Sequence, residues 1–498
     1  MNHYVLAADQ STQGTKGLLF DAYGMLIARA DRPHRQLIDS QGWISHDLNE
    51  IRRNTLAVCR EAVEKSGVDK AQIAAFAITN QRETTAAWDK LTGEPACEAI
   101  VWQCARAARI CDQIACQKGL ASIIKERTGL PLSPYFPAAK MAWLLENRPT
   151  VRLLAEQGRL AFGTIDSWLI SFLCQGSPHK TDYSNASRTQ LYDITRLSWD
   201  AEICRAFGIP MDTLPEVCMS DSLFGYTDLD GWLETPIPVH GVLGDSHGAL
   251  FGQDCRSPGR IKATYGTGSS VMMHVGDNPV FSQSGLVTSL AWGMDGKVQY
   301  VFEGNLNYTG AVITWLKNDV GLITSDAEAT ALAREANPED KAYFVPAFTG
   351  LGAPHWDSHA TGMFTGITRT TGRKEIAKAC LECIAYQITD LVKLMSRDSN
   401  LAVKILKVDG GPTASDYLMQ FQADILDSEV SVPELQELSG MGAAYVAGIA
   451  TGVYNKAELF GHVAYESYKP GMNPVRRKQL YGGWLDAVSR VLCSRRDR

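Results

Sequence analysis

Several features are absent from the sequence, and each absence excludes a class of protein. No apolar run in the 498 residues approaches the ~18–20 that a membrane-spanning helix needs. The N-terminus carries no basic segment followed by an apolar stretch, so we expect no secretory leader and no membrane partner. The twelve cysteines are scattered without a disulfide framework, and no His/Cys cluster has zinc spacing. We therefore expect free thiols in a reducing, cytoplasmic location.

The sequence also lacks the positive charge of a nucleic-acid-binding protein. Its formal net charge is −7 and its pI is about 5.9. Both values argue against nucleic acid or an acidic membrane surface as the main partner. The composition, 45% hydrophobic and 21% charged, is that of an ordinary globular protein. A small anionic substrate stays compatible with this balance, because a pocket can be basic within an acidic protein.

Two similar segments, far apart in the sequence, are its most informative feature. An apolar strand at residues 5–8 leads into the turn DQSTQGTK at 9–16, and a second strand follows at 17–20. Later, residues 261–264 lead into the turn YGTGSS at 265–270. Turns of glycine and small hydroxyl residues can aim N–H and O–H groups at a phosphate, because nothing bulky blocks its approach.

One such turn alone is most often just a hairpin. Two of them, one in each half of the chain, predict two similar lobes that hold a nucleoside triphosphate from opposite sides. This arrangement is typical of a phosphotransferase.

The order of elements in the first half is typical of one fold class. Strand patterns at residues 5–8, 17–20 and 25–29 precede a helical pattern at 49–66 and a buried strand at 73–79. This order of three strands, a helix and a strand is that of a ribonuclease H-like, or actin-like, ATPase lobe. The second half repeats the order more loosely, with strands expected at 261–264, 271–275, 285–292 and 405–408 and helices at 311–317 and 375–394.

Chain length and element order together predict two domains. A single core stops growing at ~250–300 residues, and this chain has 498. Strands that alternate with helices imply an α/β protein with mixed sheets. We place the domains at residues 1–252 and 253–498, the first for the acceptor substrate and the second for the nucleotide. No low-complexity linker separates them, so we expect a catalytic cleft at their interface.

A carboxylate at the end of a predicted strand is the candidate base. Asp245 follows an apolar strand at residues 238–243 and has Gly244 before it. It could take a proton from an attacking hydroxyl or position Mg²⁺. The alternative is that Asp245 only caps the following helix, since aspartate is a leading N-cap residue.

The first half contains further candidate binding residues. Arg82 and Glu83 follow the predicted strand at 73–79 and offer donors and acceptors to a ligand with several hydroxyl groups. They could instead form an exposed ion pair that contributes little. Trp102 could place its indole against the carbon face of a polyol, or it could be a core residue.

Motifs along nearly the whole chain resemble the glycerol kinase branch of the FGGY carbohydrate kinases. The pattern Y-x-P-x-x-K-x-x-W from Tyr135 to Trp143 is intact. The other matching runs are AITNQRETT (77–85), AIVWQ (99–103), GTIDSWL (163–169), TDYSNASRT (181–189), YGTG (265–268), PAFTGLGAP (346–354) and DGG (409–411). The resemblance implies an ATP- and Mg²⁺-dependent kinase with two actin-like domains.

The resemblance also implies roles for individual residues. Asp245 is expected to be the catalytic base, and Asp9 and Asp245 to lie at the Mg²⁺. The acceptor pocket is expected to contain Arg82, Glu83, Trp102, Tyr135, Asp245, Ser246 and Ser270. The nucleotide is expected to contact Thr12, Gln13, Gly14, Lys16, Gly266, Thr267, Gly268, Gly310, Gly410, Gly411 and Ser415.

Two departures from the family pattern concern the acceptor. Glycerol kinases carry Gln where this chain has Ser246, and Phe where it has Ser270. Both changes exchange bulk for a small hydroxyl, which adds room and hydrogen-bonding capacity. We therefore predict an acceptor larger than glycerol, such as a C4–C5 polyol, that can hydrogen-bond to Ser270, Ser246 or His247.

The sequence leaves three functions open. The first is a kinase for glycerol or a close polyol, and the second is an FGGY kinase for a ketose such as xylulose, ribulose or erythrulose. The third, from a different class, is an actin- or chaperone-like ATPase, which would not need the small-molecule pocket around Arg82 and Asp245. We also expect a homodimer or homotetramer.

Overall fold

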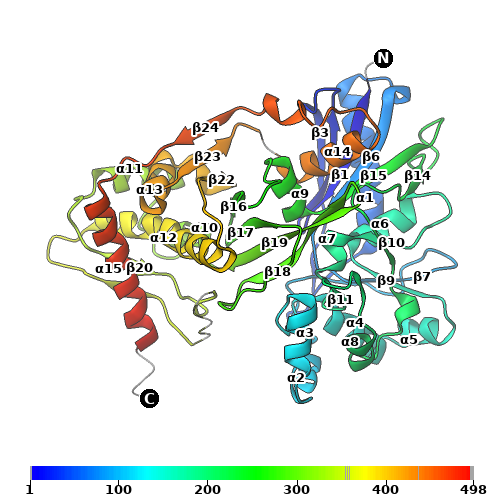
Figure 1. The fold of residues 1–498 in the computed structure, drawn as a ribbon, viewed down its shortest axis with the longest axis horizontal. Helices are drawn as coiled ribbons and strands as arrows, with labels where there is room; N and C mark the ends of the chain where they lie inside the picture. The colour runs from blue at the N-terminus through cyan, green and yellow to red at the C-terminus, as the bar shows by residue number, and fades with distance from the viewer. Residues whose placement is uncertain (1–2, 354, 356, 358, 436, 494–498) are drawn as a thin grey trace.

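The computed structural model describes residues 3–353, 355, 357, 359–435 and 437–493. The chain forms two bodies, each built on a large mixed sheet with helices around it. The sheet of the first half lies on the right in Figure 1, and most of the second half lies to its left. Within the described residues, no helix is both long and apolar enough to cross a membrane.

A six-stranded sheet forms the first body, in the order β14-β15-β6-β1-β2-β3. Strand β1 pairs antiparallel with β2 and parallel with β6, and β6 pairs parallel with β15. The carboxyl ends of β1, β6 and β15 therefore meet at one edge, which is where α/β proteins bind ligands. The strands are β1 (Tyr4–Gln10), β2 (Gly14–Phe20), β3 (Leu26–Pro33), β6 (Ile73–Asn80), β14 (Gly225–Thr227) and β15 (Ile237–Gly244).

A seven-stranded sheet forms the second body, in the order β18-β19-β17-β16-β22-β23-β24. Strand β16 pairs antiparallel with β17 and parallel with β22, so the turn after β16 lies beside the end of β22. The strands are β16 (Ile261–Tyr265), β17 (Ser269–Gly276), β18 (Val287–Met294), β19 (Lys297–Leu306), β22 (Ile405–Asp409), β23 (Glu429–Pro433) and β24 (Tyr465–Tyr468).

Short strands form small separate sheets beside the two large ones. They pair as β4-β5-β8, β7-β9, β10-β13, β11-β12 and β20-β21. Their bounds are β4 (Leu37–Ile38), β5 (Ile44–His46), β7 (Ala86–Asp89), β8 (Ala99–Ile100), β9 (Leu160–Gly163), β10 (Lys180–Asp182), β11 (Tyr192–Asp193), β12 (Ser198–Trp199), β13 (Glu216–Cys218), β20 (Tyr343–Val345) and β21 (Met363–Thr365).

The helices begin and end where the local sequence favours it. Helix α1 follows Asp47, whose side chain accepts the N–H of Asn49, and it ends at Gly67 with φ 70°. The helices are α1 (Leu48–Ser66), α2 (Ala108–Ala115), α3 (Leu120–Thr128), α4 (Pro137–Asn147), α5 (Pro149–Glu156), α6 (Ile165–Leu173), α7 (Tyr183–Ala186), α8 (Ala201–Ala206), α9 (Asp245–Gly252), α10 (Gly310–Asn318), α11 (Asp326–Glu335), α12 (Arg373–Ser399), α13 (Asp416–Leu426), α14 (Leu438–Ala450) and α15 (Pro474–Cys493).

Strand β19 of the second sheet was not predicted from the sequence. The strand expected over residues 285–292 is β18, and the unpredicted strand β19 lies between it and β17, pairing antiparallel with both. The β18–β19 connection is Asp295-Gly296, with φ 52° and 74° at the two residues. Positive φ at both central residues is the type I′ geometry that matches the twist of paired strands.

Helix α14, from the second half of the chain, packs against the sheet of the first half. It packs against α9, β15, β6 and β1, and Figure 1 shows it among the strands of the first sheet. The contact with α9 is so close that a Cβ at Gly442 would lie 1.9 Å from the carbonyl oxygen of Gly248. The second half thus supports the helix that begins with Asp245.

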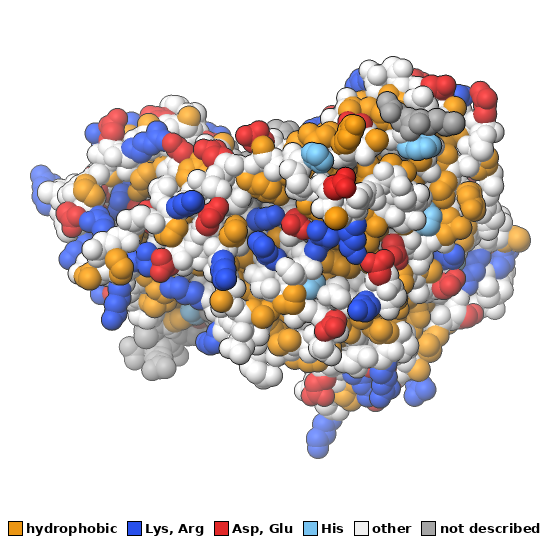
Figure 2. Space-filling view, turned by 45° about the horizontal axis from the view of Figure 1, so that its top comes forward, with side chains coloured by type: hydrophobic (Ala, Val, Ile, Leu, Met, Phe, Trp, Pro, Cys, Tyr) orange, Lys and Arg blue, Asp and Glu red, His pale blue; other side chains and the backbone are white. Residues whose placement is uncertain are grey.

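The cysteines with described side chains are free thiols, as predicted. Most are buried, including Cys380 and Cys383 within α12, while Cys116 is exposed. Basic and acidic side chains are interspersed over the face shown in Figure 2. This mixture agrees with the slightly acidic composition.

Candidate active site

The two predicted phosphate turns lie at the ends of antiparallel strand pairs. In the first, Asp9 pairs with Lys16 across β1 and β2, and in the second Tyr265 pairs with Ser269 across β16 and β17. A cavity of about 500 Å³ is lined by Thr12 from the first turn and by Gly266–Ser270 from the second. The turns of the two bodies therefore border the same cavity.

Of the residues predicted to contact the acceptor, all except His247 line this cavity. They come from both bodies: Arg82, Glu83, Trp102, Tyr135, Asp245, Ser246 and Ser270. The rings of Trp102 and Tyr135 meet edge to face, with centroids 5.5 Å apart. The indole N–H of Trp102 donates to the hydroxyl of Thr12 over 2.9 Å, which ties the acceptor wall to the first phosphate turn.

Arg82 and Glu83 do not form the exposed ion pair that was the alternative. The Arg82 guanidinium is buried and donates two hydrogen bonds of 2.8 Å to Glu303. Its Nε lies 3.3 Å from a carboxylate oxygen of Asp245. A bidentate pair of this kind fixes the guanidinium plane, so Arg82 is held in position beside the candidate base.

Glu83 belongs to the same buried group of charged side chains, because Arg188 contacts both Glu83 and Glu303. Arg188 donates from Nε to Glu83 over 2.5 Å and lies 3.0 Å from Glu303. Burial opposes ionisation of Glu303, but Arg188 and Arg82 outweigh it and hold the pKa of Glu303 well below its usual range. Glu83 has φ 61°, a left-handed conformation that costs free energy in a non-glycine residue and is typical of functional sites.

Lys140 ties three parts of the acceptor wall together. Its Nζ donates to the carbonyl oxygens of Glu83 over 3.2 Å, of Trp102 over 3.3 Å and of Tyr135. The side chain is completely buried, and burial lowers the pKa of Lys140 to about 7. The ammonium, with its three donors, thus positions the backbone of three residues predicted to contact the acceptor.

Asp245 is the first residue of α9, and Gly244 occupies the N-cap position. One Asp245 carboxylate oxygen accepts the N–H of Ser246 over 2.6 Å, yet 35% of the side chain is exposed to the cavity. The N–H of Gly244 donates to the hydroxyl of Ser184, which fixes the backbone before the carboxylate. Asp245 therefore has a local helix-end contact and is also accessible to a substrate.

A second cavity, of about 730 Å³, adjoins the first and shares Asp245, Ser246 and Thr264 with it. Asp9 and Lys16 line it, with Gly410 and Gly411 from the end of β22. Burial raises the pKa of Asp9 to about 7, and the nearby Lys16 opposes the rise. Lys16 forms an ion pair of 2.5 Å with Glu437.

A third cavity, of about 410 Å³, extends from the second turn toward α13. Of the residues predicted for the nucleotide, Gly266, Thr267, Gly310, Gly411 and Ser415 line it. The hydroxyl of Ser415 caps α13 by accepting the N–H of Leu418. The three cavities together run from the acceptor wall to α13, a length of site suited to a substrate pair.

Two residues predicted to contact the nucleotide, Gln13 and Gly14, lie outside the cavities of the site. Gln13 is exposed at the tip of the first turn. A Cβ at Gly14 would lie 2.7 Å from the carbonyl oxygen of Arg32, so this glycine is needed where β2 meets β3. His247 is also outside the acceptor cavity: it is completely buried and lies close to Gly244.

No group of three or more His, Cys, Asp or Glu side chains in the described part of the chain is arranged to hold a metal ion. Asp9 and Asp245 both line the second cavity. Mg²⁺ is commonly held by one or two carboxylates together with substrate phosphates and water. The donors present therefore fit Mg²⁺ that arrives with a nucleotide.

The sequence analysis missed four residues of this site. Glu303, Arg188 and Lys140 were not assigned roles, and neither was Lys262, which lines the second cavity. Asp295-Gly296 between two alternating apolar runs is a hairpin signal that would have revealed β19 and so Glu303. Arg188 and Lys140 lie within the matched motifs, but only the structure reveals their partners.

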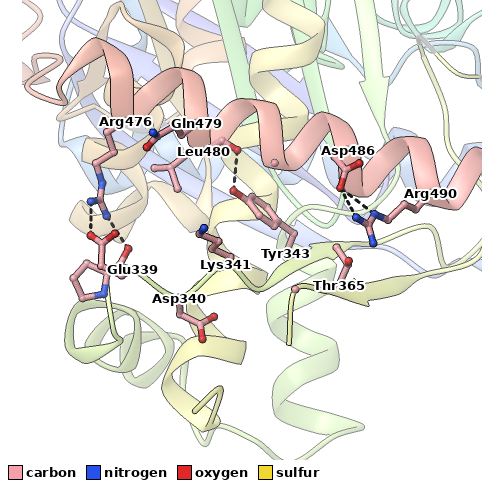
Figure 3. Close-up of a pocket in the computed structure, with 13 residues that line it drawn as sticks. Glu339, Asp340, Lys341, Tyr343, Thr365, Arg476, Gln479, Leu480, Asp486 and Arg490 are labelled. Atoms are coloured by element: carbon pink, nitrogen blue, oxygen red, sulfur yellow. Dashed lines mark hydrogen bonds and ion pairs between the residues drawn. The ribbon is translucent and has the colours of Figure 1, made fainter. Parts of the chain in front are cut away.

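Another cavity, of about 560 Å³, lies between α15 and the β20–β21 pair. Figure 3 shows Arg476 paired with Glu339 over 2.7 Å and Arg490 paired with Asp486 over 2.9 Å. The Tyr343 hydroxyl donates to the carbonyl oxygen of Leu480. The Arg476–Glu339 pair joins α15 to the segment before β20, whereas Arg490 and Asp486 pair within α15. None of the residues predicted for substrate or nucleotide lines this cavity.

The chain matches known proteins over nearly its full length. The models of the FGGY family of carbohydrate kinases match it at residues 4–252 for the N-terminal domain and 261–451 for the C-terminal domain. Glycerol kinase 2 of Thermotoga maritima is 45% identical over 491 residues, which cover 98% of this chain and 99% of that one.

Solved structures of known kinases have a similar fold over nearly the whole chain. The crystal structure of Plasmodium falciparum glycerol kinase with ADP aligns with a TM-score of 0.93 at 32% identity, over 98% of each chain. A ligand-bound xylulose kinase from Lactobacillus acidophilus aligns with a TM-score of 0.87 at 21% identity over 99% of each chain, a likeness of fold alone. The predicted two-domain, actin-like α/β fold is confirmed.

Proposed function

Because the chain belongs to the FGGY family of carbohydrate kinases, we propose that it transfers the γ-phosphoryl group of ATP to a terminal hydroxyl of a small polyol. The observation that supports this most is the single cavity in which Arg82, Trp102 and Asp245 meet the turn Gly266–Ser270. An acceptor on the first body and a phosphate on the second would meet there, next to the candidate base.

The proposed roles follow from the geometry of the cavity. Arg82 and Glu83 are fixed by buried partners, so they offer a donor and an acceptor at fixed positions to vicinal hydroxyls. Trp102 and Tyr135 offer ring surface to the carbon chain. Asp245 takes the proton of the attacking hydroxyl as general base. Asp9 and Asp245 would hold Mg²⁺, whose charge would offset that of the phosphates.

A screen of acceptors tests the function. ADP release would be measured with ATP, Mg²⁺ and each of a series of C3 to C6 polyols and ketoses, and we expect a polyol to be the best acceptor. A ketose as the best acceptor would favour the ketose kinase instead. ATP hydrolysis that is fast without acceptor and unchanged by every acceptor would favour the actin- or chaperone-like ATPase.

The second phosphate turn gives a prediction about ATP. Thr267 is exposed in the cavities, so Thr267→Val should lower kcat/KM for ATP by about tenfold or more, the effect of losing a charge-assisted hydrogen bond of about 1.5–3 kcal/mol. The KM for the acceptor should not change. Thr12→Val should affect both substrates, because it also removes the acceptor of the Trp102 N–H. Steady-state kinetics with each substrate varied would measure both effects, and a rise only in the acceptor KM of Thr267→Val would refute the assignment.

Ser270 leads to a prediction about the size of the acceptor. Ser270 Oγ is buried without a hydrogen-bond partner among the described residues, and Ser270 lines the cavity. A fourth or fifth carbon can fill the space that an aromatic ring would occupy and offer a hydroxyl to this atom. We expect glycerol to be a poor acceptor. Ser270→Phe should shift the kcat/KM ratio toward glycerol by about tenfold or more, because the ring packs on a three-carbon chain.

Preference of the unmodified protein for glycerol over every C4 and C5 acceptor would contradict the prediction about size.

His247 was expected to contribute to the wider pocket, but it does not line the cavity. We therefore attribute the extra room to Ser270 and Ser246. A cytoplasmic location and a homodimer or homotetramer stay predictions.

A further inference from the structure

Lys262 is a buried lysine with few partners. It lies in β16, in the strand that leads into the second phosphate turn, and it is 1% exposed. Its Nζ donates one hydrogen bond, of 2.8 Å, to the hydroxyl of Thr264. In the described part of the chain, no carboxylate lies within ion-pair distance of it.

A buried ammonium with one hydrogen bond is unfavourable in the free protein. The group has three donors, and burying a charge whose donors are unused costs free energy. Burial lowers the pKa of Lys262, and Asp409 and Asp245 oppose this because their charges favour the ammonium form. Proteins keep unfavourable groups of this kind mainly at functional sites.

The surroundings of Lys262 indicate what it binds. It lines the second cavity with Asp9, Asp245, Gly410 and Gly411. Lys16, the other lysine of this cavity, is already paired with Glu437. Lys262 is anchored on Thr264, which borders both the second cavity and the acceptor cavity. Its ammonium therefore lies near the junction of the two cavities.

We propose that Lys262 Nζ binds the nonbridging oxygens of the γ-phosphoryl group while that group is transferred. This role rests on the proposed kinase function. The acceptor oxygen forms a bond to the γ-phosphorus as the bond from that phosphorus to the β,γ-bridging oxygen breaks. The electron pair of the broken bond stays on ADP, and the hydroxyl proton passes to Asp245. Negative charge on the moving group is stabilised by an ammonium that is already in place before the reaction.

The test compares Lys262→Met with Lys407→Met. Lys407 is the direct partner of Lys262 on the neighbouring strand β22, and it too is a buried lysine. Its Nζ donates to the carbonyl oxygen of Gln253, and it lines none of the three cavities of the site. Lys262→Met should lower kcat by about 10²-fold or more, as loss of a preorganised charge does. Lys407→Met should keep kcat within about threefold.

Thermal melting separates a catalytic from a structural role. Lys262→Met removes a costly buried charge, so its melting temperature should stay unchanged or rise while kcat falls. A melting temperature that falls together with kcat in Lys262→Met would make Lys262 structural and overturn the proposal. Lys262→Gln provides the same comparison if the methionine variant does not fold.

Binding gives a readout that depends on the γ-phosphate itself. Calorimetry with a nonhydrolysable ATP analogue and with ADP, each with Mg²⁺, should find the analogue bound about tenfold or more weakly by Lys262→Met. ADP should bind within about twofold of the unmodified protein. Equal weakening of both nucleotides, or unchanged kcat, would overturn the role of Lys262. An unmodified protein that releases no ADP with any acceptor would instead overturn the kinase function.

Discussion

Asp245→Asn is expected to fold like the unmodified protein and to lose about 10²–10⁴-fold in kcat, the usual contribution of a general base. The amide keeps an oxygen for the N–H of Ser246 and for Arg82 Nε, so the local contacts stay in place. It cannot accept the hydroxyl proton at neutral pH. Turnover of the best acceptor, with binding of that acceptor measured separately, would give the loss in the chemical step.

Asp416→Asn is the matched control for this variant. Asp416 is also the first residue of a helix, accepts the N–H of the following residue, Tyr417, and pairs with an arginine, Arg334. It is exposed and lines none of the three cavities of the site. We expect its kcat to be unchanged. A drop of less than tenfold in Asp245→Asn would mean that another group takes the proton.

The largest loss of stability is expected from Glu303→Gln. Glu303 is the carboxylate between Arg82 and Arg188, and its side chain is fully buried. The amide leaves two buried guanidinium groups with less compensating charge, which should cost about 3 kcal/mol or more, as breaking a buried ion pair does. Urea unfolding followed by circular dichroism would measure the change. Activity should fall as well, because Arg82 loses its bidentate partner.

Glu382→Gln distinguishes this electrostatic effect from the effect of substituting any buried glutamate. Burial raises the pKa of Glu382, whereas the arginines hold that of Glu303 well below 4.5. Glu382 pairs with a single lysine, Lys378, over 3.4 Å, whereas Glu303 lies between two arginines, so the neutral amide should cost less at position 382 than at position 303. Because folding lowers the pKa of Glu303, the ionised carboxylate stabilises the folded state. This stabilisation is complete above pH 4.5 and is lost as the pH falls through the lower pKa of the folded state. Equal losses in the two variants would contradict this account.

Local patterns in the sequence were enough to predict the elements that carry the site. Strand β1, its turn and β2 were expected from an apolar run, a glycine-containing turn and a second apolar run. Helix α1 was placed to within one residue, because its apolar positions recur at helical spacing. Asp245 was placed at the end of a strand because a glycine and an apolar run precede it.

Contacts between distant residues could not be predicted in this way. Arg82 was read with its neighbour Glu83, yet its partner Glu303 lies 221 positions away. The spacing of apolar residues in the sequence cannot predict this ion pair, since the pair depends on how β19 lies beside the first sheet. Trp102 could equally have been a core residue, and only the cavity around it reveals that its ring faces other site residues.

The position of α14 has a consequence for how the protein is made. The first sheet is complete once β15, which ends at Gly244, has left the ribosome, but the helix that covers part of it spans Leu438–Ala450. At about 5–20 residues per second, synthesis leaves that apolar surface uncovered for about 10–40 s. The nascent first half is therefore expected to need a chaperone, and expressed alone it should aggregate. Supplying the second half as a separate chain during synthesis should restore solubility.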